Sequence, residues 1–178
     1  SDLTLKDADI RTTKSGVAIL VGQMLGGTIT NTHVSGTIKA DSHNVGTLVG
    51  YMERGSIADS SGSGRIDNHF SWYTGGLVGR MEPGATLSRS SADTTTNGFV
   101  STGGLVGANA GTIEQSFAKG SVESNASNLG GLVGENYGEI WQSYALTDVT
   151  GGSNNVGGLA GLNGSKGTIE QLSKSVVK

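Results

Sequence analysis

Three histidines, His33, His43 and His69, are the side chains of this 178-residue chain best suited to bind a metal or transfer a proton. A zinc peptidase needs the motif His-Glu-x-x-His on a helix, together with a further carboxylate ligand. None of the three histidines belongs to such a motif. The chain has no cysteine, which excludes disulfide bonds and thiolate metal sites. We therefore expect no metal site in these residues.

Other catalytic patterns are incomplete. Gly62-Ser63-Gly64 lacks the strand-to-helix elbow of a serine hydrolase, and we interpret it as a strand of small residues. The glycine-rich segments are not followed by the helix that a phosphate-binding loop requires. Some parallel β-helices cleave polysaccharides with clustered carboxylates, but four aspartates occupy different positions of the repeat described below: Asp59, Asp67, Asp93 and Asp148. We expect neither a catalytic residue nor a bound cofactor.

Composition narrows the class of partner. Lys+Arg 12 against Asp+Glu 15 gives a net charge of −3, and no stretch is basic, whereas nucleic-acid binding needs a cationic surface. No apolar run is long enough to predict insertion into a membrane. Glycine, with 31 residues, is more than twice as frequent as the usual value of about 7%. Because the glycines follow a repeat, they indicate required backbone positions and not a flexible linker.

The repeat is organised around a short core, seen most clearly in Gly130-Gly131-Leu132-Val133-Gly134. Its leucine recurs at 20, 48, 77, 105, 132 and 159, in steps of 28, 29, 28, 27 and 27 residues. A fixed period in this range is typical of stacked-repeat architectures. We divide the chain into a partial coil, 1–15, and six repeats of one domain: 16–44, 45–73, 74–101, 102–128, 129–155 and 156–178. The chain begins within the pattern and shows no signal peptide, so we interpret it as a fragment of a larger protein.

Each repeat contains two strand-like segments separated by a glycine turn. After the core comes an apolar anchor, such as Ile113, and then small or apolar residues alternate with others. In the fourth repeat the alternation predicts that Ser116, Ala118, Gly120 and Val122 point inward. Apolar spacing of 3.6 residues is not sustained anywhere, which argues against helices. Antiparallel hairpins would give differing cross-strand patterns, whereas a solenoid places like residues over like residues. The sequence predicts an all-β fold, a parallel β-solenoid (β-helix) of about six coils of 27–29 residues.

Two columns of residues test this prediction. Two residues after the core glycine, three repeats carry methionine and three carry asparagine, which suggests a stacked methionine run and a hydrogen-bonded asparagine run at a corner. These residues are Met24, Met52, Met81, Asn109, Asn136 and Asn163. A second column faces outward if alternation is strict, and would then need either a twist in the strand or a covering element: Val21, Val49, Val78, Val106 and Val133. The sequence leaves that choice open, as it does the choice between two and three strands per coil.

Two groups of side chains are candidates for partner binding. Outward positions of the fourth and fifth repeats carry Phe117, Lys119, Trp141, Tyr144 and Leu146, and stacking places Phe117 one rung from Tyr144. The other group, His69, Phe70, Trp72 and Tyr73, lies in what we expect to be the longest connecting loop. Exposed aromatic clusters are typical of binding surfaces, although such residues also brace a sheet or fold back over it.

The unit Gly-Gly-Leu-Val-Gly-x-Asn-x-Gly-x-Ile-x-x-Ser-x-Ala-x-Gly-x-Val at residues 103–122 resembles the GLUG repeat, and the resemblance extends over residues 16–178. The first three repeats depart from it, with Met for Asn and with Thr47 in place of a glycine. GLUG repeats occur in exported bacterial surface proteins, including the non-catalytic N-terminal region of IgA-specific zinc metalloendopeptidases, and in adhesin-like proteins. The resemblance implies an extracellular or cell-surface location and a spacer or substrate-docking role, with IgA1 as a possible partner. It equally implies an adhesin segment that binds a host glycan or protein.

Overall fold

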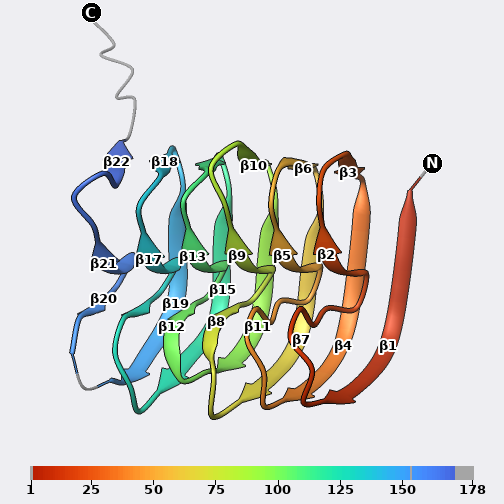
Figure 1. The fold of residues 1–178 in the computed structure, drawn as a ribbon, viewed down its shortest axis with the longest axis horizontal. Helices are drawn as coiled ribbons and strands as arrows, with labels where there is room; N and C mark the ends of the chain where they lie inside the picture. Colours follow the sequence, from red (N-terminus) through yellow and green to blue (C-terminus); the bar gives the residue numbers. More distant parts are fainter. Residues whose placement is uncertain (1, 153, 171–178) are drawn as a thin grey trace, which may run out of the picture.

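The computed structural model describes residues 2–152 and 154–170, and this part of the chain contains β-strands and no helix. Parallel strands stack along one axis to form a β-solenoid of about six turns, as the repeat predicted (Figure 1). The first strand of the chain, β1 (Leu3–Thr12), and the last described strand, β22 (Thr168–Glu170), lie at opposite ends of the stack (Figure 1).

The strands form four parallel sheets. Sheet A consists of β1 (Leu3–Thr12), β4 (Thr32–Ala40), β7 (Ser61–Asn68), β11 (Ser91–Asn97), β15 (Phe117–Ser124) and β19 (Tyr144–Gly151). Sheet B consists of β8 (Trp72–Gly75), β12 (Val100–Gly103), β16 (Leu129–Gly130) and β20 (Val156–Gly157). Sheet C consists of β2 (Val21–Met24), β5 (Val49–Met52), β9 (Val78–Met81), β13 (Val106–Asn109), β17 (Val133–Asn136) and β21 (Ala160–Asn163). Sheet D consists of β3 (Thr28–Thr30), β6 (Gly55–Ala58), β10 (Ala85–Ser88), β14 (Thr112–Glu114), β18 (Glu139–Trp141) and β22 (Thr168–Glu170).

Strand pairing follows the repeat register. The apolar anchors form one column in sheet D, where Ile57 pairs with Leu87 and Ile113 pairs with Ile140. The anchors of β6, β10, β14 and β18 are almost completely buried. A complete coil holds up to four strands, more than the two or three that the sequence left open, because the segment after the anchor bends between sheets D and A and a further strand, in sheet B, precedes the core.

The corner between sheets D and A has a repeated local design. One residue per coil adopts a left-handed backbone conformation there: Asn31, Asp59, Arg89, Gln115 and Gln142. The next residue is Thr32 or a serine, whose hydroxyl donates to the carbonyl two residues earlier, as Ser60 does to Ala58 at 2.8 Å. The Ser60 amide donates in turn to the hydroxyl of Ser90 on the following coil at 3.1 Å. Buried polar groups at this corner therefore have partners along the stack.

The valine column points inward, with Val21 partly buried and the other four valines fully buried; of the two alternatives that the sequence left open, the strand departs from strict alternation and no covering element is needed. Leu77 and Val78 are both fully buried, as are the corresponding pairs in β5, β13 and β17. The reason is a tight bend at the core leucine: the amides of Leu77 and Val78 both donate to the carbonyl of Leu105. Two successive amides cannot point the same way in an extended strand, so alternation is interrupted between sheets B and C.

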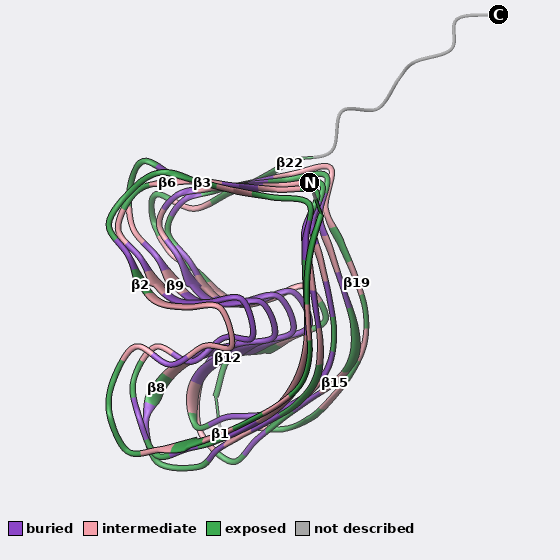
Figure 2. Cartoon of the chain, turned by 90° about the vertical axis from the view of Figure 1, so that its right-hand side faces the viewer, coloured by how far each residue is buried: buried purple, intermediate pink, exposed green. Residues whose placement is uncertain are grey.

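At this bend the wall of the solenoid folds inward, which Figure 2 shows as the buried segment between β12 and β2. The outer faces of sheets B and C then meet backbone to backbone. A Cβ atom on Gly79 would lie 2.5 Å from the amide nitrogen of Val45, and one on Gly103 would lie 2.7 Å from that of Gly134. Only glycine permits such an approach, which explains why glycines flank the core.

The inward fold reaches sheet A and divides the interior into two parts. A Cβ atom on Gly104, next to the core leucine, would lie 2.9 Å from the Cβ of Ala118. The larger interior, between sheets C, D and part of A, contains the leucines, valines, methionines and anchors. The smaller interior, against sheet B, begins with Val17, Ile38, Ala40, Val45 and Ile66. The small residues of sheet A are therefore required where the bend touches it.

The methionine and asparagine columns stack as predicted. Met81 pairs with Asn109 where the column changes, and the first five members are buried. Asn109 Nδ2 donates to Asn136 Oδ1 at 2.8 Å, and Asn136 Nδ2 donates to Asn163 Oδ1 at 2.8 Å. Ser116 at the corner and Ala118 and Val122 in sheet A are buried as expected, but Gly120, which has a φ of 98°, is exposed.

Candidate partner-binding surfaces

The aromatic pair predicted on sheet A is present, and we call its residues Phe117, Lys119, Tyr144 and Leu146 the outer-face patch. Phe117 pairs with Tyr144 and Lys119 pairs with Leu146 across β15 and β19. The rings of Phe117 and Tyr144 are stacked, with centroids 5.2 Å apart and an interplanar angle of 8°. Lys119 Nζ lies 5.2 Å from the centre of the Phe117 ring, within cation–π range.

Stacking leaves much of the outer-face patch accessible. Tyr144 is 48% exposed and Leu146 is 62% exposed. On the preceding coils the column of Phe117 continues as Ser91, Ser61 and His33, so the aromatic surface ends sharply at β15. Parallel stacking in register is what produces the pair, since the two residues are 27 positions apart in the repeat.

Trp141 does not belong to this patch, contrary to its grouping by sequence. It lies in β18 of sheet D, before the corner at Gln142, whereas Tyr144 begins β19 of sheet A. The Trp141 indole is half-buried and donates to Glu139 Oε2 at 3.3 Å. Its nearness in sequence to Tyr144 is misleading because the corner turns the chain between them.

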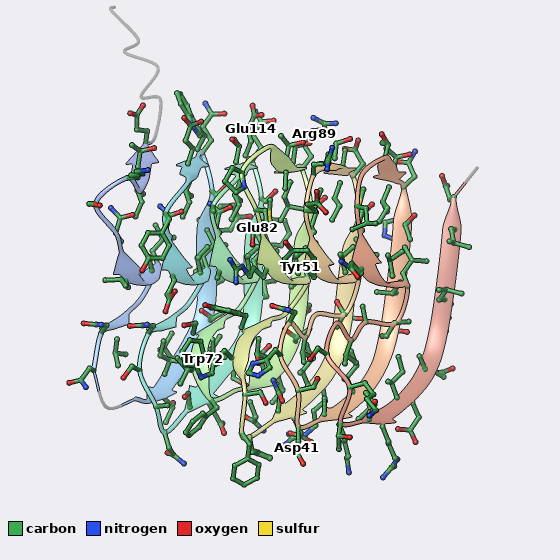
Figure 3. The ribbon with its side chains drawn as sticks, in the orientation of Figure 1. Asp41, Tyr51, Trp72, Glu82, Arg89 and Glu114 are labelled. Atoms are coloured by element: carbon green, nitrogen blue, oxygen red, sulfur yellow. The ribbon has the colours of Figure 1, made fainter. Side chains whose placement is uncertain are left out.

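The second group is divided between a short loop and a strand, and not contained in a long loop. Phe70 is 75% exposed, but Trp72 and Tyr73 belong to β8 because sheet B pairing begins at Trp72. The Trp72 amide lies 3.3 Å from His43 Nδ1, and the Trp72 and Tyr73 rings form an edge-to-face pair with centroids 6.0 Å apart. Figure 3 shows Trp72 in the lower half of the molecule, at β8.

His69 lies apart from this aromatic pair. It lines a hollow of about 680 Å³ at the edge where sheet A leads into the loops, together with Arg11, Lys14, Lys39, Asp41 and Asp67. Figure 3 labels Asp41 at this edge. The lining carries both signs of charge and therefore does not select for one sign of ligand.

Tyr73 marks a feature that the sequence did not reveal. Where the inward fold opens to the outside, residues at the start of sheet B, such as Tyr73, face residues on the outer side of sheet C, and we call this opening the notch. The Arg80 guanidinium lies 5.0 Å from the centre of the Tyr73 ring, and Arg80 also pairs with Glu82 at 2.6 Å. Burial, followed by the nearby Glu135 carboxylate, raises the pKa of Tyr73.

Farther along the notch, hydrogen-bonded side chains occupy the space between sheets B and C. Glu135 of sheet C accepts from the Ser101 hydroxyl and from the Asn128 amide. Asn155 Nδ2 donates to Asn128 Oδ1 at 2.7 Å, which extends the row to the next coil. The sequence contained a signal for the notch, because one outward position of sheet C carries a different residue in every repeat while its neighbours are regular. The residues at this position are Gln23, Tyr51, Arg80, Ala108, Glu135 and Leu162.

The first coils leave the notch open. A hollow of about 400 Å³ is lined by Ser15, Gly16, Gly22, Gln23, Asn44 and Tyr51. Gly16 and Asn44 stand there at the position that tyrosine fills at residue 73. Burial, followed by the Glu82 carboxylate, raises the pKa of Tyr51. Glu82 directly follows β9 and lies near Tyr51 of β5 (Figure 3).

Within residues 2–152 and 154–170, no group of three or more His, Asp or Glu side chains is arranged to hold a metal ion. That same part of the chain has no helix long and apolar enough to cross a membrane. No protein-family model and no curated protein matches the chain.

Proposed function

We propose that this chain is a non-catalytic β-solenoid segment of an exported bacterial surface protein, and that it docks a protein partner through the outer-face patch. The observation that carries the proposal is the stacked, solvent-exposed pair Phe117–Tyr144 with Lys119 over one ring and Leu146 beside it. Aromatic side chains on a rigid support lose little entropy on binding and dominate interface hot spots.

The GLUG-like repeat at residues 103–122 supports a more specific form of the proposal. In it, the parent protein is similar to an IgA-specific zinc metalloendopeptidase, and this segment spaces the distant catalytic domain and helps to dock IgA1. The solenoid suits this role because stacked coils make a rigid spacer whose surface patches keep fixed positions.

The test is binding of the purified chain to immobilised IgA1, with an unrelated immunoglobulin and mucin glycans as control surfaces. The double variant Phe117→Ala/Tyr144→Ala should lose IgA1 binding, since one hot-spot aromatic contributes about 2 kcal/mol or more, or roughly 30-fold in affinity. Phe70→Ala is the matched control, because it removes an exposed aromatic from another part of the surface. Binding that survives the double variant, or an absence of any binding, would contradict docking through this patch.

An adhesin segment is the second candidate function, favoured by the exposed Trp72, whose ring pairs with Tyr73 and whose amide lies against His43. In that case mucin glycans would bind in the same assay and IgA1 would not. Trp72→Ala should then reduce the signal, while Phe117→Ala/Tyr144→Ala should leave it unchanged.

A further inference from the structure

The open part of the notch has the form of a small-molecule site. Its volume of about 400 Å³ falls within the range of about 300–1,000 Å³ that is usual for ligand pockets. One wall is formed by Gly22, Gln23 and Tyr51 of β2 and β5, and the other by Ser15, Gly16 and Asn44, which lie in bends of the first two coils. The two walls approach each other closely at the base, where a Cβ atom on Gly22 would lie 2.5 Å from the Gly16 carbonyl oxygen.

The lining has a distinct chemistry. Tyr51 supplies an aromatic ring, Gln23 and Asn44 supply amides, Ser15 supplies a hydroxyl, and Gly16 and Gly22 expose backbone. None of these side chains carries a formal charge at neutral pH. Such a surface offers nothing specific to an ion, and suits a neutral ligand with hydroxyl groups on one side and C–H groups on another.

Asn44 adds an unused hydrogen-bonding atom to this lining. Its Oδ1 is buried and has no hydrogen-bond partner among the described residues. At the corresponding position two and three coils later, Ser101 and Asn128 are both hydrogen-bonded to Glu135. A buried amide oxygen without a partner costs free energy, and because Asn44 also lines the hollow, a turn of its side chain toward the hollow would let this oxygen accept from a hydroxyl group.

We propose that this hollow binds one neutral sugar unit, with a C–H face of the sugar against the Tyr51 ring and its hydroxyls bonded to the amides of Gln23 and Asn44. An amide group both donates and accepts, as a sugar hydroxyl does, and an aromatic face accepts an apolar ring surface. The site is separate from the outer-face patch on sheet A, and it goes beyond the proposed docking function. The unit recognised is either a free monosaccharide or the end of a glycan chain.

The experiment is titration of the purified chain, followed by the side-chain and backbone amide signals in NMR spectra. The probes are glucose, galactose and N-acetylglucosamine as free sugars, and chitotriose and lactose as short chains. We expect saturable shifts of the Asn44 and Gln23 amides with at least one probe. A tighter fit for the short chains would identify a glycan end, and equal affinity would identify the monosaccharide as sufficient.

Three variants make the test specific. Tyr51→Ala should weaken binding by about two- to tenfold through loss of ring stacking, whereas Tyr51→Phe keeps the ring and should bind nearly as the parent does. Asn44→Gly removes the amide yet tolerates the φ of 60° at this position, and it should weaken binding by a similar factor. Tyr144→Ala, in the outer-face patch, should bind sugar normally.

Two results would overturn the proposal: no saturable shift with any of the five probes, or binding that Tyr51→Ala and Asn44→Gly leave intact. Circular dichroism of each variant excludes unfolding as the cause of a loss. Because the docking assay relies on Phe117 and Tyr144, failure of the sugar site leaves the outcome for the protein partner unaffected.

Discussion

Thr47, in the bend, contacts Gly62, in sheet A, and exchanging the sizes of these two residues by mutation gives the sharpest test of how the inward fold packs against sheet A. In three coils a glycine of the bend faces an alanine of sheet A: Gly76 with Ala92, Gly104 with Ala118, and Gly131 with Ala145. In the second coil the order is reversed, with Thr47 in the bend and Gly62 in the sheet. Thr47 is fully buried, and its hydroxyl donates to the Gly76 carbonyl at 2.6 Å.

The Gly62→Ala variant should be destabilised. A Cβ atom added to Gly62 would lie 1.9 Å from Thr47 Oγ1 and 3.0 Å from Thr47 Cβ and Leu77 Cδ1. Relief requires Thr47 to leave its rotamer and release its hydrogen bond, and overpacking of this kind costs about 1–3 kcal/mol. Thr47→Gly alone should also be destabilised, by about 1–2 kcal/mol, through loss of the hydrogen bond and of packed volume.

The double variant Thr47→Gly/Gly62→Ala recreates the glycine–alanine pair of the later coils and should recover much of the loss. Urea denaturation of the parent, both single variants and the double variant yields a coupling free energy, which we expect to be about 1–3 kcal/mol in favour of the double variant. The matched control is Gly158→Ala. Gly158 occupies the repeat position of Thr47 in the last coil, and an added Cβ atom there meets nothing within 4 Å. Additive effects, within about 0.5 kcal/mol, would refute the size-exchange argument.

Three further predictions concern other parts of the solenoid. Asn136→Met should lower the free energy of unfolding by about 1–3 kcal/mol, measured by urea denaturation, because it removes the Asn136 oxygen and leaves the Asn109 amide with only the more distant Glu139 carbonyl, at 3.4 Å, as acceptor. An unchanged midpoint would contradict this. Burial opposes ionisation of Asp67, but hydrogen bonds from Arg65 and Asn97 outweigh this effect and lower the pKa of Asp67. The ionised Asp67 therefore stabilises the fold above the ordinary pKa of 3.8, and this contribution is lost as the pH falls through the lower pKa of the folded state. Asp67→Asn should therefore lose less stability than the parent between about pH 4 and pH 2 in acid denaturation, and parallel acid limbs would argue against this pairing. Amide hydrogen exchange should be faster in β1, which has one neighbouring strand, than in β7 and β11, which have two. Equal protection of these three strands would disprove this. The fast exchange expected after residue 170 concerns residues outside those described.

How much of the candidate site could be predicted depended on whether it follows the repeat. The Phe117–Tyr144 pair was predictable because parallel coils place residues one period apart on the same face. Trp141 was wrongly grouped with them because the left-handed residue Gln142 turns the chain by a corner that the sequence does not mark clearly. The notch residues Arg80 and Glu135 were missed because their partners lie in a different sheet, which meets sheet C only after the wall folds inward.

By itself, the sequence determined the solenoid, its period and its register, together with the methionine and asparagine columns. These follow from one physical fact: each coil lies on the last, so that like side chains must pack on or hydrogen-bond to one another. Only the tertiary structure decided that the valine column is buried, that the interior is divided in two, and that a notch opens on the outside. The reason lies at the core leucine, where flanking glycines are compatible with either a straight strand or a sharp bend. The choice is made by the backbone contact between sheets B and C and by the small residues of sheet A, which lie far away in the sequence.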